Sequence, residues 1–206
     1  VMQDDCYLLA ADGWTAETYR IIQVNKKGKE VDKGWACDLV PKDLIVNRYF
    51  PNDQDTLDAL IAQAEALTGQ MGELEEEHSA EDGYFGGWDK VNKAQAQARL
   101  KELKHDPDAA EERQVLQEYL ELSAKLSAVN ANAKTAAAVL DDQAYRHYKM
   151  LTTDEIKTLV VDDKWLAAIM QAVQGETERI SQRLANRIKE LAERYETPLP
   201  LQQQTV

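Results

Sequence analysis

Two long stretches of the chain repeat apolar residues at alternating spacings of three and four. The first stretch has Leu57, Leu60, Ala64, Leu67, Met71 and Leu74. The second has Val115, Tyr119, Leu122, Leu126, Val129, Ala133, Ala136 and Leu140. This spacing places the apolar side chains on one stripe of an α-helix. We therefore predict a mainly α fold in which residues 51–150 form a helical hairpin with heptad stripes, as an antiparallel coiled coil or a bundle. Two helices that face an ordinary globular core would show the same spacing.

The segment between the two stripes contains turn and capping signals. Residues 79–89 combine three glycines with Tyr84, Phe85 and Trp88, which predicts a loop with an aromatic plug. Asn92 is placed to cap a short helix that extends to about Lys104. The pair Asp106-Pro107 is typical of a helix start and predicts where the second long helix opens.

The C-terminal part, residues 151–206, predicts a short helix, a last long helix and an extended tail. Thr152 and Glu155 have the spacing of a capping box. The long helix is expected to begin at Asp162 or Asp163 and to end before Thr197-Pro198-Leu199-Pro200. Its apolar residues are Leu166, Ile169, Val173, Ile180, Leu184, Ile188, Leu191 and Tyr195. Their period is near that of a straight helix rather than a strict heptad.

Residues 1–50 predict a small unit that contains β-strands. Apolar runs at 6–10 and 19–24 and an alternating run at 35–39 indicate two or three antiparallel strands, followed by a short helix at 42–50. So small a sheet is rarely stable alone. The chain also opens on Val1 rather than on methionine. We expect a piece of a longer protein, in which this unit packs on an upstream domain.

Composition limits the classes of function. No run of 18 apolar residues is present, so we expect a soluble, cytoplasmic protein without a membrane span. The formal net charge of -13 opposes unspecific binding to nucleic acid. The two cysteines, Cys6 and Cys37, are expected to be ordinary buried thiols.

The motifs of the common catalytic centres are missing from the sequence. No two of the five prolines are adjacent, so an Asn/Asp-Pro-Pro-aromatic element for methyl transfer to an amino group cannot be formed. No two glycines stand two residues apart, which excludes a Gly-x-Gly cofactor loop. The histidines, His78, His105 and His147, never pair at the spacing of a helical metal site. We predict no catalytic, cofactor-binding or metal-ligating residue in this chain.

One polar pattern on the last helix is a candidate partner interface. Arg179, Arg183 and Arg187 follow one another at intervals of four beside the apolar stripe, and Trp165 and Tyr195 bracket the helix. The ridge is either a solvated face or a basic surface for a partner subunit or a DNA backbone. The glutamates that partly neutralise it are Glu176, Glu190 and Glu193.

Several segments resemble a known family. Residues 4–14 (DDCYLLAADGW) and 33–39 (KGWACDL) resemble the stretch that follows the catalytic domain in the modification subunits of type I restriction-modification systems. Residues 154–165, from DEIK to VVDDKW, and residues 188–200, from IKELAERY to PLP, resemble the C-terminal end of the same subunits. The heptads between them add little, because any coiled coil would match.

The resemblance implies that the full-length protein is an N6-adenine DNA methyltransferase, which uses S-adenosylmethionine as its methyl donor. Two modification subunits join one specificity subunit, and a restriction subunit can join as well. The methyl-donor and adenine-binding motifs of the family lie upstream of the region that this chain resembles. The chain is then expected to be a non-catalytic assembly region that reaches DNA only through the complex, with the last helix as the docking element. We also expect the isolated chain to self-associate as a dimer.

Two other functions fit the same residues. The first is a freestanding coiled-coil adaptor with no relation to restriction. The second is direct binding of a DNA backbone by the ridge of Arg179, Arg183 and Arg187.

Overall fold

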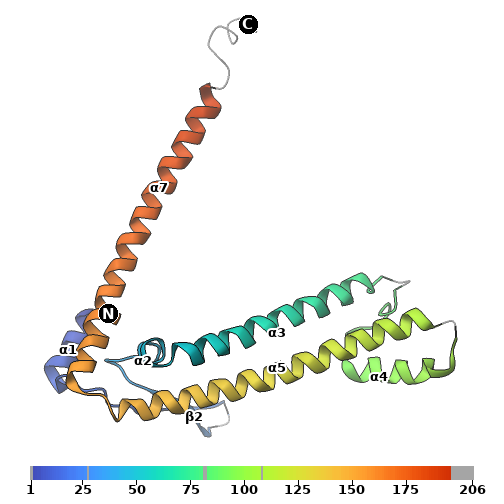
Figure 1. Ribbon diagram of the computed structural model, residues 1–206, viewed down its shortest axis with the longest axis horizontal. Coiled ribbons are helices and arrows are strands. Elements are labelled where there is room, and N and C mark those ends of the chain that lie inside the picture. The colour runs from blue at the N-terminus through green and yellow to red at the C-terminus, as the bar shows by residue number, and fades with distance from the viewer. Residues whose placement is uncertain (1, 27, 81–82, 108, 196–206) are drawn as a thin grey trace, which may run out of the picture. The chain divides into compact units, whose positions relative to one another are not determined.

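The computed structural model describes residues 2–26, 28–80, 83–107 and 109–195, which are mainly helical with one small antiparallel sheet (Figure 1). The chain divides into two compact units. The hairpin unit consists of residues 45–150, and the terminal unit combines the described parts of 1–44 and 151–206. The two ends of the chain, which the sequence suggested as separate regions 1–50 and 151–206, thus belong to one unit.

The hairpin unit is built on two long antiparallel helices. α3 (Pro51–Glu77) and α5 (Ala110–Tyr148) lie side by side (Figure 1). Every residue of the predicted α3 stripe is half-buried, and every residue of the α5 stripe is buried or half-buried. The 3-4 spacing therefore identified the faces that meet. The short helix α2 (Lys42–Tyr49) precedes α3, and Pro51 occupies the first turn of α3, where it loses no hydrogen bond.

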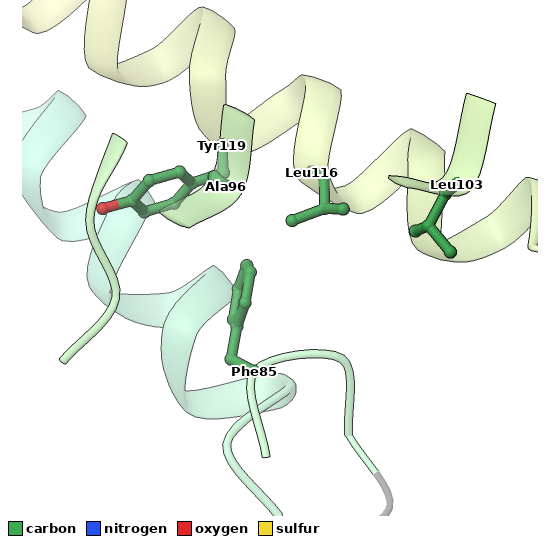
Figure 2. Packing of buried hydrophobic residues seen from close by; sticks show 5 residues of the cluster. All are labelled: Phe85, Ala96, Leu103, Leu116 and Tyr119. Atoms are coloured by element: carbon green, nitrogen blue, oxygen red, sulfur yellow. The ribbon is translucent and has the colours of Figure 1, made fainter. Parts of the chain in front are cut away.

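The end of the hairpin carries a core of its own. α4 (Lys93–Glu102) and a short 3-10 turn (Leu103–His105) pack beside the start of α5. The buried residues here are Phe85, Ala96, Leu103, Leu116 and Tyr119 (Figure 2). The predicted aromatic plug is confirmed: Phe85 is 2% exposed. Its ring lies 5.6 Å from that of Trp88 and 5.7 Å from that of Tyr119.

The predicted helix boundaries near this core are partly right. Asn92 caps α4 by accepting a hydrogen bond from the Gln95 N–H at 3.0 Å, as predicted. The predicted start of α5 at Asp106-Pro107 is wrong, because α5 begins at Ala110. Asp106 closes the preceding turn instead: its N–H donates to the Leu103 carbonyl at 3.2 Å, and its backbone is extended.

The terminal unit opens with a helix where the sequence suggested a strand. α1 spans Met2–Asp12 and includes the apolar run at 6–10. Asp4 and Asp5 lie in its first turn, where negative charge favours a helix. Gly13, at φ 72°, ends α1, and its N–H donates to the Leu9 carbonyl at 3.0 Å. This left-handed glycine is a common helix stop, and the Asp12-Gly13 pair was its signal.

The sheet of the terminal unit is a single hairpin. β1 (Tyr19–Val24) pairs antiparallel with β2 (Glu30–Ala36), with an irregularity in the pairing between Arg20 and Ile22. The strand expected at 35–39 therefore begins earlier and ends at Ala36. Its predicted alternation is nevertheless present, because Trp35, Cys37 and Leu39 are buried.

The last part of the terminal unit is one uninterrupted run of helix. α6 (Thr153–Thr158) starts with the predicted capping box of Thr152 and Glu155. It continues through a π-helical stretch, η2 (Leu159–Leu166), into α7 (Ala167–Tyr195). The helix start predicted at Asp162 or Asp163 is wrong, because both residues lie inside η2. The proline stop predicted at Thr197-Pro198-Leu199-Pro200 and the extended tail lie outside the described residues.

The two thiols lie in different environments. Cys37 is buried, and burial raises the pKa of its thiol, whereas Cys6 is exposed, contrary to expectation. Because the thiolate is the reactive form, Cys37 should react with a disulfide reagent at least about tenfold more slowly than Cys6. A folded unit that holds this thiol protonated also loses stability as pH rises from the ordinary thiol pKa through the raised one.

The measurement is the rate at which the disulfide reagent releases its leaving thiol at about pH 8. It is made on the variants Cys6→Ser and Cys37→Ser, each of which retains one cysteine. In denaturant the two rates should converge. Equal rates in the folded protein would contradict the burial of Cys37.

Candidate docking interface

The main candidate interface is α7, which is amphipathic and uncovered. None of its residues is buried. Val173 is 62% exposed and Leu184 61% exposed, values typical of surface lysines rather than of core leucines. The large apolar residues of this exposed face are Leu166, at the end of η2, and Ile169, Met170, Val173, Ile180, Leu184, Ile188, Leu191 and Tyr195 of α7. An apolar stripe of this length in water usually marks a surface that binds another molecule.

The start of this continuous helix is held by a polar clasp within the terminal unit. Asp5 of α1 is 3% exposed, and its carboxylate accepts hydrogen bonds from Lys164 Nζ and from Trp165 Nε1, both at 2.7 Å. Lys164 also donates to the Leu39 carbonyl at 2.9 Å. The charged groups of this clasp are thus satisfied by direct partners, as burial requires. The clasp fixes η2, from which α7 continues.

The clasp gives Trp165 a role inside the terminal unit. Its ring centroid lies 6.5 Å from that of Trp14, and its indole N–H is used by Asp5. Trp165 is half-buried at η2 and does not lie on the exposed face of α7. Sequence reasoning missed Asp5 and Lys164, which are separated by 159 residues along the chain.

The arginines of the predicted ridge all lie on α7 and are exposed. Arg179 forms an ion pair with Glu176, which lowers the pKa of that carboxyl and raises that of the guanidinium. Arg187 pairs with Glu190 at 2.8 Å. Arg183 forms no ion pair with any residue that the structure describes. A shallow depression on the helix surface is lined by Ile180, Arg183, Leu184, Asn186, Arg187 and Glu190.

Tyr195, the last predicted interface residue, ends α7 and is 66% exposed. The Arg194 guanidinium lies 6.0 Å from the centre of its ring. Tyr195 therefore shares the exposed face with the arginine ridge, whereas Trp165 does not. The structure thus brings four of the five predicted residues onto one helix.

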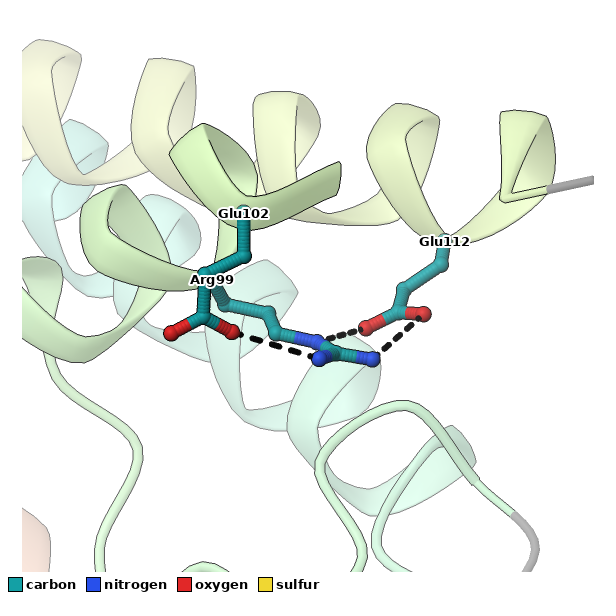
Figure 3. A network of polar contacts seen from close by, with 3 residues as sticks. All are labelled: Arg99, Glu102 and Glu112. Atoms are coloured by element: carbon teal, nitrogen blue, oxygen red, sulfur yellow. Dashed lines mark hydrogen bonds and ion pairs between the residues drawn. The ribbon is translucent and has the colours of Figure 1, made fainter. Parts of the chain in front are cut away.

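A second polar site lies at the end of the hairpin unit. Arg99 of α4 bridges Glu112 of α5, at 2.6 and 3.2 Å, and Glu102 of its own helix at 3.3 Å (Figure 3). These residues, with Tyr84 and Trp88, line an open cavity of about 640 Å³. The carboxylates raise the pKa of Arg99 and occupy its donors. The arrangement suits a tie between α4 and α5 better than an anion-binding site.

The described residues contain no group of three or more His, Cys, Asp or Glu side chains placed to hold a metal ion. No helix among them has the length and hydrophobicity needed to cross a membrane.

A comparison with protein-family models matches none of them, and searches of the curated proteins and of the solved structures find no significant match.

Proposed function

We propose that this chain is the non-catalytic C-terminal assembly region of a type I restriction-modification methylation subunit, and that α7 docks it onto the specificity subunit. One observation carries the proposal: a helix of 29 residues has a continuous apolar face and no buried residue. The family assignment itself comes from the resemblance of the end segments. Those segments supply Asp5, Leu39, Lys164 and Trp165, which meet in the clasp from which α7 extends.

The dimensions of α7 suit such an interface. At a rise of 1.5 Å per residue, its 29 residues extend over about 43 Å. Burial of one Leu or Ile side chain is worth about 1.5–3 kcal/mol, and α7 offers several in a row. A partner with a pair of helices can cover such a stripe by bundling with it. Methyl transfer, S-adenosylmethionine and direct DNA contact then belong to other parts of the complex, in agreement with the net charge of -13.

The proposal includes the further partners of such a complex. A second modification subunit would dock by its own α7 on the same specificity subunit, and a restriction subunit would join the assembled core. Without these partners, the face of α7 stays in water. The isolated chain is then expected to form dimers through α7 at high concentration, because burial of two such faces removes them from water. Sedimentation that shows a monomer throughout the concentration series would contradict this expectation.

The test of docking is a pair of matched double variants. Ile180→Asp/Leu184→Asp places two carboxylates on the apolar face of α7. Gln171→Asp/Gln182→Asp adds the same charge on the opposite face of the same helix. We expect the first variant to weaken binding to the co-expressed specificity subunit at least about 100-fold, and the second to change it less than about threefold.

Circular dichroism checks that both variants keep their helix. Equal binding by the two variants would refute docking through this face. If the unchanged chain fails to bind the specificity subunit at all, the freestanding adaptor becomes the better interpretation.

A further inference from the structure

The apolar face of α7 has two unlike edges. At 3.6 residues per turn, Arg183, Arg187 and Arg194 line one edge, and Ser181, Ala185 and Ala192 line the other. The side chains of the first edge are long and cationic. The second edge is uncharged, and its side chains at Ser181, Ala185 and Ala192 are short, so another helix backbone can come close to it there. The face is therefore not symmetric about its apolar stripe.

The cationic edge keeps a surplus of positive charge. The side of α7 that carries it has four arginines, Arg179, Arg183, Arg187 and Arg194, and two glutamates, Glu176 and Glu190, a net of +2. The two glutamates are used by Arg179 and Arg187. Arg183 and Arg194 form no ion pair with any described residue. In a chain of net charge -13, this edge is an exception that a partner can recognise.

The spacing of the face indicates how a partner helix would lie. Ile169, Ile180 and Leu191 follow one another at intervals of 11, and so do Val173, Leu184 and Tyr195. Repeats of 11 correspond to 3.67 residues per turn, which keeps the stripe nearly straight or gives it a slight right-handed turn. A partner helix can then run along the whole face of α7 without the left-handed supercoil of a heptad seam.

A second copy of α7 fits this face less well in the antiparallel than in the parallel orientation, so the dimer expected of the isolated chain would be parallel. Antiparallel helices bring equal edges together, so the arginines of one copy would meet those of the other. Like charges at such a contact oppose association, and salt would strengthen the pair by screening them. A partner with carboxylates at this edge gains from the same arginines, and salt would weaken it.

We propose that α7 binds a protein helix that carries acidic side chains along the edge facing Arg183 and Arg187. This inference rests on the proposed docking function and names the partner chemistry. The carboxylates of the partner compete with Glu190 for Arg187 and supply a partner for Arg183. Apolar contacts along the stripe provide the affinity, and the arginine edge selects the partner and its orientation.

The test is the affinity of the chain for the specificity subunit at about 50 mM and about 500 mM NaCl. We expect Arg183→Glu/Arg187→Glu to weaken binding roughly tenfold or more at low salt, and two- to threefold at high salt, as screening removes the repulsion. The matched control is Lys125→Glu/Lys134→Glu, which makes the same change of charge on the exposed surface of α5. The control should stay within about twofold of the unchanged chain.

Several results would overturn the inference. If the arginine variant binds as well as the control while Ile180→Asp/Leu184→Asp does not bind, docking stands and the acidic edge is wrong. If neither aspartate pair on α7 changes binding, or the unchanged chain does not bind, both proposals fail together. If the unchanged chain retains a DNA duplex at low salt and Arg183→Glu/Arg187→Glu abolishes this retention, the edge serves a phosphate backbone and not a protein helix.

Discussion

Asp5→Ala is expected to destabilise the terminal unit by about 2–4 kcal/mol. The substitution removes the carboxylate that Lys164 and Trp165 share at 2.7 Å. Lys164, whose side chain is 14% exposed, would keep its charge with only the Leu39 carbonyl as a partner. The loss measures the cost of leaving buried donors unpaired, and not the net value of the ion pair itself.

Urea unfolding followed by tryptophan fluorescence can isolate this effect. Three of the four tryptophans, Trp14, Trp35 and Trp165, lie in the terminal unit. The variant Trp88→Phe therefore removes the signal of the hairpin unit and is a suitable background. Asp12→Ala is the control, because it deletes the same charge from an exposed position of α1 and should change stability by less than about 0.5 kcal/mol.

Two more variants separate the causes. Asp5→Asn keeps an acceptor for Trp165 but loses the charge that Lys164 needs, so an intermediate loss is expected. Asp5→Leu/Lys164→Met removes both charges and should recover much of the stability lost in Asp5→Ala. Equal losses in Asp5→Ala and Asp12→Ala would show that the clasp does not hold α1 in the terminal unit.

The clasp also shows where prediction from sequence reaches its limit. The stripes of α3 and α5 and the capping box at Thr152 depend on residues three or four apart, and local spacing was enough to find them. The Asp5–Lys164 pair joins positions 159 residues apart, and no local pattern connects them. The sequence predicts a strand at residues 6–10 because five apolar residues fit either a strand or a helix, whereas the contacts that bury Asp5 of α1 are tertiary.

The exposed apolar face of α7 was predictable for the same local reason. Ile180, Leu184 and Arg183 share one side of a helix by spacing alone, and the structure keeps them exposed on α7. Trp165 has the large amphipathic side chain that is common in interfaces. It lies in a π-helical stretch, however, and contacts Asp5 and Trp14. A π-helical stretch shifts which residues share a face of the helix, and a sequence pattern read at 3.6 residues per turn cannot reveal it.

The hairpin unit should lose about 3–5 kcal/mol of stability in Phe85→Ala. Phe85 lies in the core at the end of the hairpin, where its ring is near that of Tyr119 (Figure 2), with centroids 5.7 Å apart. Its ring centroid also lies 6.0 Å from that of His78 and 5.6 Å from that of Trp88. Its removal leaves a cavity between the loop and α5. The aromatic geometry adds to the loss of buried area.

The readout is the fluorescence of Trp88, the only tryptophan of the hairpin unit, in a chain with Trp14, Trp35 and Trp165 replaced by phenylalanine. Tyr84→Ala is the matched control from the same loop. Tyr84 is half-buried and donates one hydrogen bond to Glu111 at 3.1 Å, so its loss should cost about 1 kcal/mol.

Phe85→Leu should recover part of the loss, because it keeps an apolar side chain in the same place. Limited proteolysis should then cut the Phe85→Ala variant at the loop and α4 first, while α3 and α5 survive longer through their common stripe. Equal losses in Phe85→Ala and Tyr84→Ala would mean that the end of the hairpin is held by the Arg99–Glu112 tie rather than by its aromatic core.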